Sequence, residues 1–101
     1  MTYSYIFHSK AQEEYEQSVR WYSERSLQVS TKFIIAVNAA LKLICDNPGR
    51  WRNGYKNYYE LGVKKYPFNL IYVIEPANKR VVITAVYHGK RNPKRKYRNP
   101  K

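Results

Sequence analysis

The sequence is poor in several residue types, and each shortage excludes a class of protein. Its single cysteine, Cys45, excludes an internal disulfide, and no histidine stands beside it at the spacing of a metal site. No apolar run approaches the length needed to span a membrane, and residues 1–5 show no basic region followed by an apolar one. We therefore expect a cytoplasmic protein that uses no metal, no organic cofactor and no membrane.

Acidic residues are also scarce, with 7 Asp and Glu against 19 Lys and Arg, so the formal net charge is +12. Much of the excess lies in the run HGKRNPKRKYR at residues 88–98. The charge could serve only solubility, but a clustered surplus of this size favours binding to a polyanion or to an acidic protein. With 101 residues and 44% hydrophobic residues, the chain is large enough for one folded domain.

The second half of the chain contains the strongest strand signals. Residues 68–74 and 81–87 are rich in Val, Ile and Tyr and are separated by a polar segment that includes Pro76. They predict a hairpin, and because nearly every position is apolar, they predict strands covered on both faces at the centre of a sheet. Residues 2–7 and 57–63 alternate and predict two more strands, whereas residues 50–55 are interpreted as a loop.

Two amphipathic helices are predicted between the first two strands. The first runs from about Lys10 to Glu24 with Ser9 as its N-cap, and its acidic side chains, Glu13, Glu14 and Glu16, are expected to point outward. The second ends at Asn47 before Pro48. Its apolar stripe consists of Val29, Phe33, Val37, Ala40, Leu41 and Ile44.

The predicted order is β-α-α-β-β-β, which is an α+β domain with a helical hairpin on one face of a mainly antiparallel sheet. We assign residues 1–97 to this domain and residues 98–101 to a basic tail. Because consecutive strands reverse direction, residues 63–66 should lie at the same edge as residues 87–91. The basic residues of this edge and of the following run are candidates for binding a nucleic acid or another target: Lys64, Lys65, Lys90, Arg91, Lys94 and Arg95.

Three motifs in the second half of the chain resemble those of a known family. They read VKKYPF at residues 63–68, LIYVIE at residues 70–75 and AVYHGKRNP at residues 85–93. In this order and spacing, they resemble the RelE/ParE superfamily of toxins from type II toxin–antitoxin systems. RelE-like members are ribosome-dependent ribonucleases that cut mRNA, whereas ParE-like members act on DNA gyrase.

The resemblance extends unevenly to the residues of a RelE-like nuclease. Arg91 and Tyr97 match its arginine and its terminal tyrosine, but Glu60, Gly62 and Asn69 stand where it has basic residues. A carboxylate at position 60 would repel the phosphate that a lysine should hold. The motifs therefore favour the ParE-like branch, with a RelE-like nuclease as the alternative.

Four residues are catalytic candidates only if the chain is a nuclease, and each of them has an alternative role. Arg91 is suited to bidentate phosphate contacts, and its alternative is a solvated position in the basic run. Tyr97 could move a proton or stack on a base, but a packing anchor for the tail is the favoured role, because the chain uses tyrosine freely. His88 could be an acid or base or a structural histidine, and Glu60 could be a general base or a cross-strand salt-bridge partner.

The resemblance also implies partners. A toxin of this kind is neutralised by a cognate antitoxin, and the pair binds operator DNA; the target would be DNA gyrase or, for the alternative, the ribosome. A third possibility is a basic nucleic-acid-binding domain of the same fold without toxicity. The sequence leaves these alternatives open.

Overall fold

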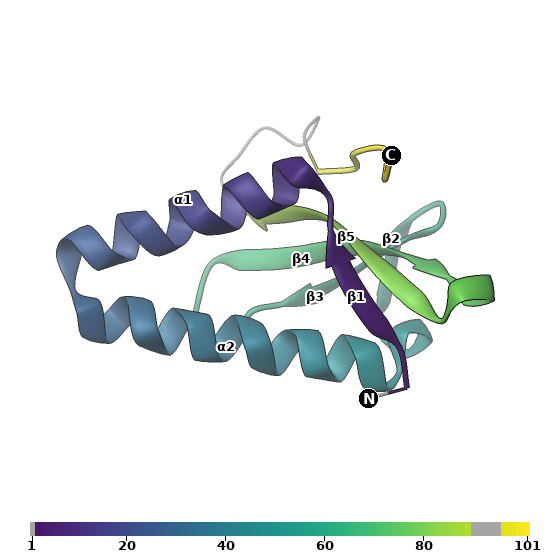
Figure 1. Cartoon of the computed structure of the whole chain (residues 1–101), viewed down its shortest axis with the longest axis horizontal. Coiled ribbons are helices and arrows are strands. Elements are labelled where there is room, and N and C mark those ends of the chain that lie inside the picture. Colours follow the sequence, from purple (N-terminus) through teal and green to yellow (C-terminus); the bar gives the residue numbers. More distant parts are fainter. Residues whose placement is uncertain (1, 90–95) are drawn as a thin grey trace.

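A computed structural model describes residues 2–89 and 96–101 of the chain (Figure 1). Within these residues, two helices pack on a sheet of five strands in the order β1-β5-β4-β3-β2. The predicted α+β class and the order of elements are confirmed, with one additional strand, β2. The elements are β1 (Ser4–Phe7), α1 (Ser9–Arg25), α2 (Leu27–Asp46), β2 (Arg52–Tyr55), β3 (Tyr58–Gly62), β4 (Phe68–Glu75) and β5 (Arg80–His88), with short 3-10 turns at Pro48–Arg50 and Pro76–Asn78.

The predicted hairpin of β4 and β5 forms the centre of the sheet. β3 and β5 flank β4 in antiparallel pairing, whereas β1 runs parallel to β5 from Ser4↔Arg80 to Phe7↔Ile83. The pairing steps from Ile71↔Ala85 to Tyr72↔Ile83, so Thr84 is an extra residue that forms a β-bulge in β5. On one face the side chains of Leu70, Tyr72 and Val86 meet the helices, and on the other Ile71, Ala85 and Tyr87 form a smaller cluster. This explains why both strands are apolar at nearly every position.

The two helices form an antiparallel pair and are connected by one residue, Ser26. Ser26 ends α1 and caps α2, because its hydroxyl accepts a hydrogen bond from the Val29 N–H at 3.2 Å. The predicted Ser9 cap of α1 is wrong. The N-cap is His8, whose Nδ1 accepts from the Lys10 N–H at 3.0 Å, because His8 keeps the extended backbone of β1 while Ser9 is already helical.

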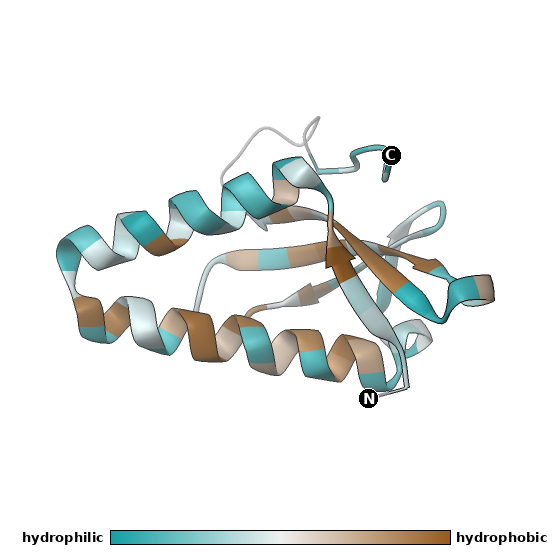
Figure 2. Ribbon diagram, viewed as in Figure 1, coloured by the Kyte–Doolittle hydropathy of each residue, from teal (hydrophilic) through white to brown (hydrophobic). Residues whose placement is uncertain are grey.

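α2 is the main core helix, and Figure 2 shows hydrophobic residues along it and along the central strands. Phe33, Val37 and Ile44 are fully buried against the sheet, as the stripe predicted, although Val29 is partly exposed. By length and composition alone, α2 could also span a membrane. The expectation that no apolar run approaches that length is therefore wrong, but the buried stripe explains the same composition as packing of a core helix.

The segment interpreted as a loop at residues 50–55 contains β2, which corrects the sequence prediction. Arg52 pairs with Glu60 and Asn53 with Tyr59, and the register shifts before Tyr55 pairs with Tyr58. All four residues of β2 are exposed. An edge strand of this kind buries no side chains and therefore leaves no alternating pattern in the sequence.

Candidate functional site

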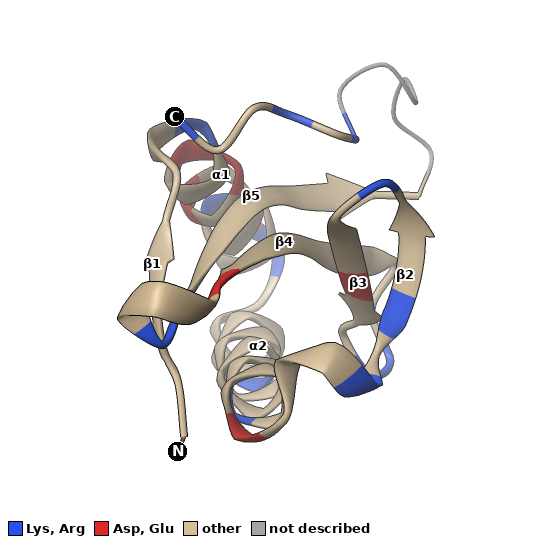
Figure 3. Ribbon diagram, turned by 90° about the vertical axis from the view of Figure 1, so that its right-hand side faces the viewer, with Lys and Arg blue, Asp and Glu red and all other residues tan. Residues whose placement is uncertain are grey.

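The C-terminal residues pack against the folded domain. We call residues 96–101 the C-terminal strap. Tyr97 joins the cluster of Ile71, Ala85 and Tyr87 on the face of the sheet opposite the helices. Figure 3 shows this segment passing over the sheet towards α1. The strap therefore covers the face that the helices leave open.

Glu60 is held beneath the strap. Glu60 is the only acidic residue of β3, where it forms the red patch in Figure 3, and it is only 6% exposed. Lys96 Nζ donates a hydrogen bond to Glu60 Oε1 at 3.3 Å and forms an ion pair with Glu60 Oε2 at 3.1 Å. The contact at Oε2 does not have hydrogen-bond geometry, and among the described residues no donor hydrogen-bonds to this oxygen. Burial lowers the pKa of Lys96, but hydrogen bonding and attraction to Glu60, with a contribution from Tyr97, outweigh it and raise the pKa above its usual value. The expected salt bridge of Glu60 is thus made with the strap rather than with a neighbouring strand.

Gly54 allows this close packing. A Cβ at position 54 would lie 2.7 Å from Glu60 Oε2 and 3.0 Å from the Tyr97 hydroxyl oxygen. Both distances are shorter than ordinary van der Waals contact, so a side chain at position 54 would force the carboxylate of Glu60 or the hydroxyl of Tyr97 to shift. The carboxylate is therefore enclosed by β2, Lys96 and Tyr97.

Tyr97 packs against two other tyrosines. Its ring centroid lies 4.9 Å from that of Tyr55 and 5.3 Å from that of Tyr58. The Tyr58 hydroxyl donates to the Arg98 carbonyl oxygen at 2.9 Å. These contacts anchor the strap, and a proton-transfer role of Tyr97 stays a prediction.

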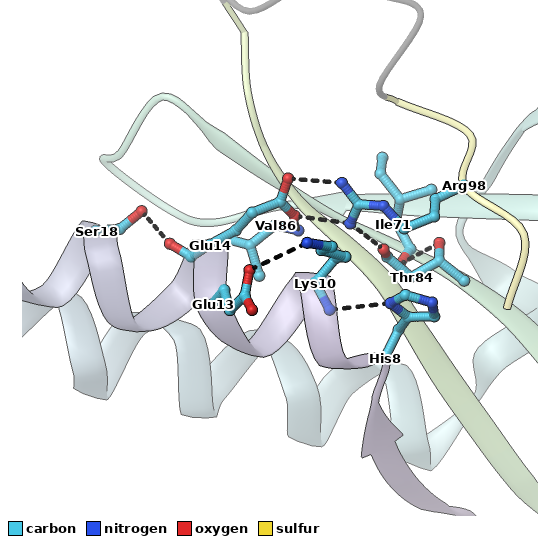
Figure 4. Close-up of polar contacts among 9 residues, drawn as sticks. All are labelled: His8, Lys10, Glu13, Glu14, Ser18, Ile71, Thr84, Val86 and Arg98. Atoms are coloured by element: carbon cyan, nitrogen blue, oxygen red, sulfur yellow. Dashed lines mark hydrogen bonds and ion pairs between the residues drawn. The ribbon is translucent and has the colours of Figure 1, made fainter. Parts of the chain in front are cut away.

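Arg98 and Glu14 join the strap to α1 and β5 (Figure 4). The Arg98 guanidinium donates to both carboxylate oxygens of Glu14, at 3.1 and 3.0 Å, and to the Thr84 carbonyl oxygen at 2.8 Å. Glu14 Oε1 also accepts from the Val86 N–H at 3.0 Å. Because β1 pairs with β5 only as far as Ile83, these side chains complete the edge of β5 beyond the bulge.

The expectation that Glu14 points outward is wrong. Its position, three residues after Ala11 and four before Ser18, places it on the same helical face as these two buried residues. Helical spacing could therefore have identified Glu14 as an inward-facing residue. No local signal identifies its partner Arg98, which lies 84 residues away in the sequence.

His88 lies on the other face of the sheet. Its ring meets Phe68 edge-on at 5.0 Å, and with Trp21 and Tyr22 of α1 it lines a cavity of about 540 Å³. The structure therefore brings Glu60 and Tyr97 together but separates His88 from them. His8 is also engaged elsewhere: since Nδ1 accepts from Lys10, Nε2 carries the proton and donates to the Lys101 carbonyl oxygen at 3.0 Å.

The basic candidates are only partly described. The Gly89 N–H donates to the Pro67 carbonyl oxygen at 3.0 Å, so the turn between β3 and β4 lies beside the end of β5, as the strand reversal predicts. Lys64 and Lys65 are exposed in that turn. The other members of the set lie outside the described residues: Lys90, Arg91, Lys94 and Arg95. Their convergence with the two lysines stays a prediction.

Residues 2–89 and 96–101 contain no group of three or more His, Cys, Asp or Glu side chains that could hold a metal ion.

A family model described as the ParE toxin of the type II toxin–antitoxin system, parDE, matches residues 5–93. Among solved structures, the chain is similar to one from the chromosomal ParDE system of P. aeruginosa, with a TM-score of 0.70 and 15% identity over 86% of this chain and 96% of that chain. It is also similar to the isolated E. coli RelE toxin, with a TM-score of 0.60 and 17% identity over 90% of this chain and 88% of that chain. No curated protein sequence matches. At these identities, the structural similarity establishes the fold.

Proposed function

Because the chain belongs to the ParE toxin family of type II toxin–antitoxin systems, we propose that it arrests bacterial growth by binding DNA gyrase. In this proposal it acts as a protein ligand and does not cleave RNA. Membership of the family makes the chain a toxin with an antitoxin partner. The target and the absence of catalysis are the proposed parts.

The position of Glu60 supports the absence of catalysis most directly. RNA cleavage needs a base for the 2′-hydroxyl, a cation for the phosphate and an acid for the leaving oxygen at one place. Glu60 is buried and paired with Lys96, Tyr97 is packed against two tyrosines, and His88 lies on the opposite face. Among the described residues, the candidate groups therefore do not share one accessible site.

Positive charge supports binding to a large acidic partner. The net charge of +12 strengthens encounter with acidic surfaces of either a target or an antitoxin. We propose that Lys64 and Lys65 contact the target together with the basic run, in which Arg91 is the leading candidate. We further propose that a cognate antitoxin neutralises the toxin in the cytoplasm and that the pair binds operator DNA.

A supercoiling assay with purified gyrase tests the proposal. The purified chain should inhibit DNA supercoiling by gyrase, and the variant Tyr97→Phe should inhibit equally, because it keeps the packed ring and removes only the ionisable hydroxyl. A parallel translation reaction should show no mRNA cleavage on ribosomes. Unimpaired supercoiling, combined with ribosomal mRNA cleavage that Tyr97→Phe abolishes, would overturn the proposal in favour of the RelE-like alternative.

A further inference from the structure

The cavity that His88 lines lies between α1, the start of β4 and the end of β5. Its volume of about 540 Å³ falls within the range of pockets that hold a ligand or a large side chain, about 300–1,000 Å³. No aspartate or glutamate of residues 2–89 and 96–101 lines it. Most of the lining residues carry rings, and these are Trp21, Tyr22, Pro67, Phe68 and His88. We call this feature the α1 cavity, and its lining suits an apolar or aromatic group.

Trp21 forms an exposed part of the cavity wall and is already held in place. It is 51% exposed, and its ring meets that of Tyr22 edge-on with the centroids 5.1 Å apart. The guanidinium carbon of Arg25 lies 3.6 Å from the centre of the indole ring, and Arg25 Nη1 donates to the Trp21 carbonyl oxygen at 2.8 Å. Because these contacts fix the indole before a partner arrives, covering it costs little side-chain entropy. A fixed, half-exposed tryptophan of this kind is typical of the residues that dominate the binding energy of an interface.

The α1 cavity adjoins the surface that we propose for the target. Pro67 follows Lys65 by two residues, and its carbonyl oxygen accepts from the Gly89 N–H at 3.0 Å, so the cavity wall, the lysine turn and the end of β5 meet at one place. Lys65 has a φ of 72°, a conformation that glycine and asparagine adopt more readily than lysine. A charged residue kept in an unfavourable backbone conformation is typical of functional surfaces.

We propose that the α1 cavity binds a large apolar or aromatic side chain of the target, from a segment that also carries aspartate or glutamate. This inference rests on the proposed function, because it uses Lys64 and Lys65 as target contacts. The inserted side chain would cover Trp21, and the neighbouring carboxylates would meet the ammonium groups of the two lysines. A second copy of this chain is a poor occupant, because each copy has a net charge of +12.

Surface plasmon resonance with immobilised gyrase tests the site. Trp21→Ala removes part of the wall, and Gln17→Trp adds a large ring to the lining from an exposed position on α1. Each should raise Kd by roughly tenfold or more, mainly through faster dissociation. The matched control is Gln12→Trp, which makes the same substitution on α1 at an exposed residue that does not line the cavity. It should change Kd by less than about twofold.

Lys65→Asn separates the charge from the cavity. Asparagine suits the left-handed backbone at this position and removes only the ammonium group. Loss of a charge at the edge of an interface chiefly slows association and weakens its dependence on salt. Lys65→Asn should therefore lower the association rate, whereas the two cavity variants should chiefly raise the dissociation rate.

Growth arrest without antitoxin separates this inference from the proposed function. With normal melting temperatures, the two cavity variants should fail to arrest growth, and Gln12→Trp should arrest it like the wild type. An unchanged Kd for gyrase in both cavity variants would overturn the inference and leave the proposed function standing. Weaker binding to the antitoxin with unchanged binding to gyrase would also overturn it, because the cavity would then belong to the antitoxin.

If the wild type itself does not bind gyrase, the proposed function is wrong, and growth arrest alone decides the inference. Loss of arrest in the cavity variants but not in Gln12→Trp would support an anchoring cavity for another target. Arrest by all three variants would overturn it.

Discussion

Removal of the Arg98 side chain should loosen the C-terminal strap and destabilise the whole domain. In Arg98→Ala, Glu14 loses two hydrogen bonds from the guanidinium and keeps the one from the Val86 N–H, while the Thr84 carbonyl oxygen loses its donor. The pair is largely shielded from water, with side chains that are 21% and 12% exposed. Its loss should therefore cost more than that of a surface ion pair.

The expected loss lies between two reference cases. Exposed pairs contribute about 0–1 kcal/mol, whereas breaking a fully buried pair costs about 3–5 kcal/mol. We expect Arg98→Ala to lower the free energy of unfolding by about 2–3 kcal/mol. For a domain of this size, 1 kcal/mol corresponds to roughly 4–8 °C in Tm, so Tm should fall by about 10 °C or more.

Thermal unfolding followed by circular dichroism measures this loss, and Arg80→Ala is the matched control. Arg80 pairs with Glu75 at 2.6 Å, but both side chains are about one-third exposed, at 35% and 34%. Its loss should cost less than about 1 kcal/mol. Arg98→Lys should give an intermediate Tm, because lysine keeps the positive charge but cannot make the bidentate contact with the Glu14 carboxylate. If Arg98→Ala and Arg80→Ala lower Tm equally, the strap does not contribute to stability as we infer.

Three further predictions concern the enclosure of Glu60, the buried tyrosine and the basic run. Gly54→Val should destabilise the domain by about 1–3 kcal/mol in urea unfolding, because its side chain would collide with the packed strap, whereas Gly49→Ala, with open space around its Cβ, should cost far less. Tyr72→Phe should cost about 1 kcal/mol near neutral pH, because the buried hydroxyl donates to the Pro48 carbonyl oxygen at 2.6 Å. Burial also raises the pKa of Tyr72. The stabilising contribution of its hydroxyl is therefore complete below the pKa of about 10 in the unfolded chain, and it is lost as the pH rises through the pKa in the folded protein. Urea unfolding should show that Tyr72→Phe loses less stability at alkaline pH than the wild type does. Arg91→Ala should abolish growth arrest, and retained arrest with normal folding would count against the basic run as the working surface.

The parts of the fold that the sequence predicts correctly have local signals. The stripe around Phe33, Val37 and Ile44 repeats at helical spacing, so α2 could be placed without knowledge of its partners. β4 and β5 are recognisable because their apolar density requires cover on both faces. Each signal reflects burial of many side chains within one segment.

The parts that the sequence missed depend on contacts between distant segments. β2 has exposed side chains and is defined only by its backbone pairing with β3. The ion pair of Lys96 with Glu60 joins residues that are 36 positions apart, and nothing in either local pattern indicates it. His88 was grouped with Glu60 and Tyr97 as a nuclease candidate, but it lies on the other face of the sheet. Side chains alternate along β5, so His88 points to the helical face while Ala85 and Tyr87 point to the face that holds Tyr97.

We propose that this toxin stops growth through DNA gyrase and not through RNA cleavage. The most direct test induces the chain in bacteria that lack the antitoxin and pulse-labels DNA synthesis and protein synthesis in the same culture. We predict that DNA synthesis falls first and that the DNA-damage response rises. An earlier fall in protein synthesis, with mRNA cut on ribosomes, would contradict it.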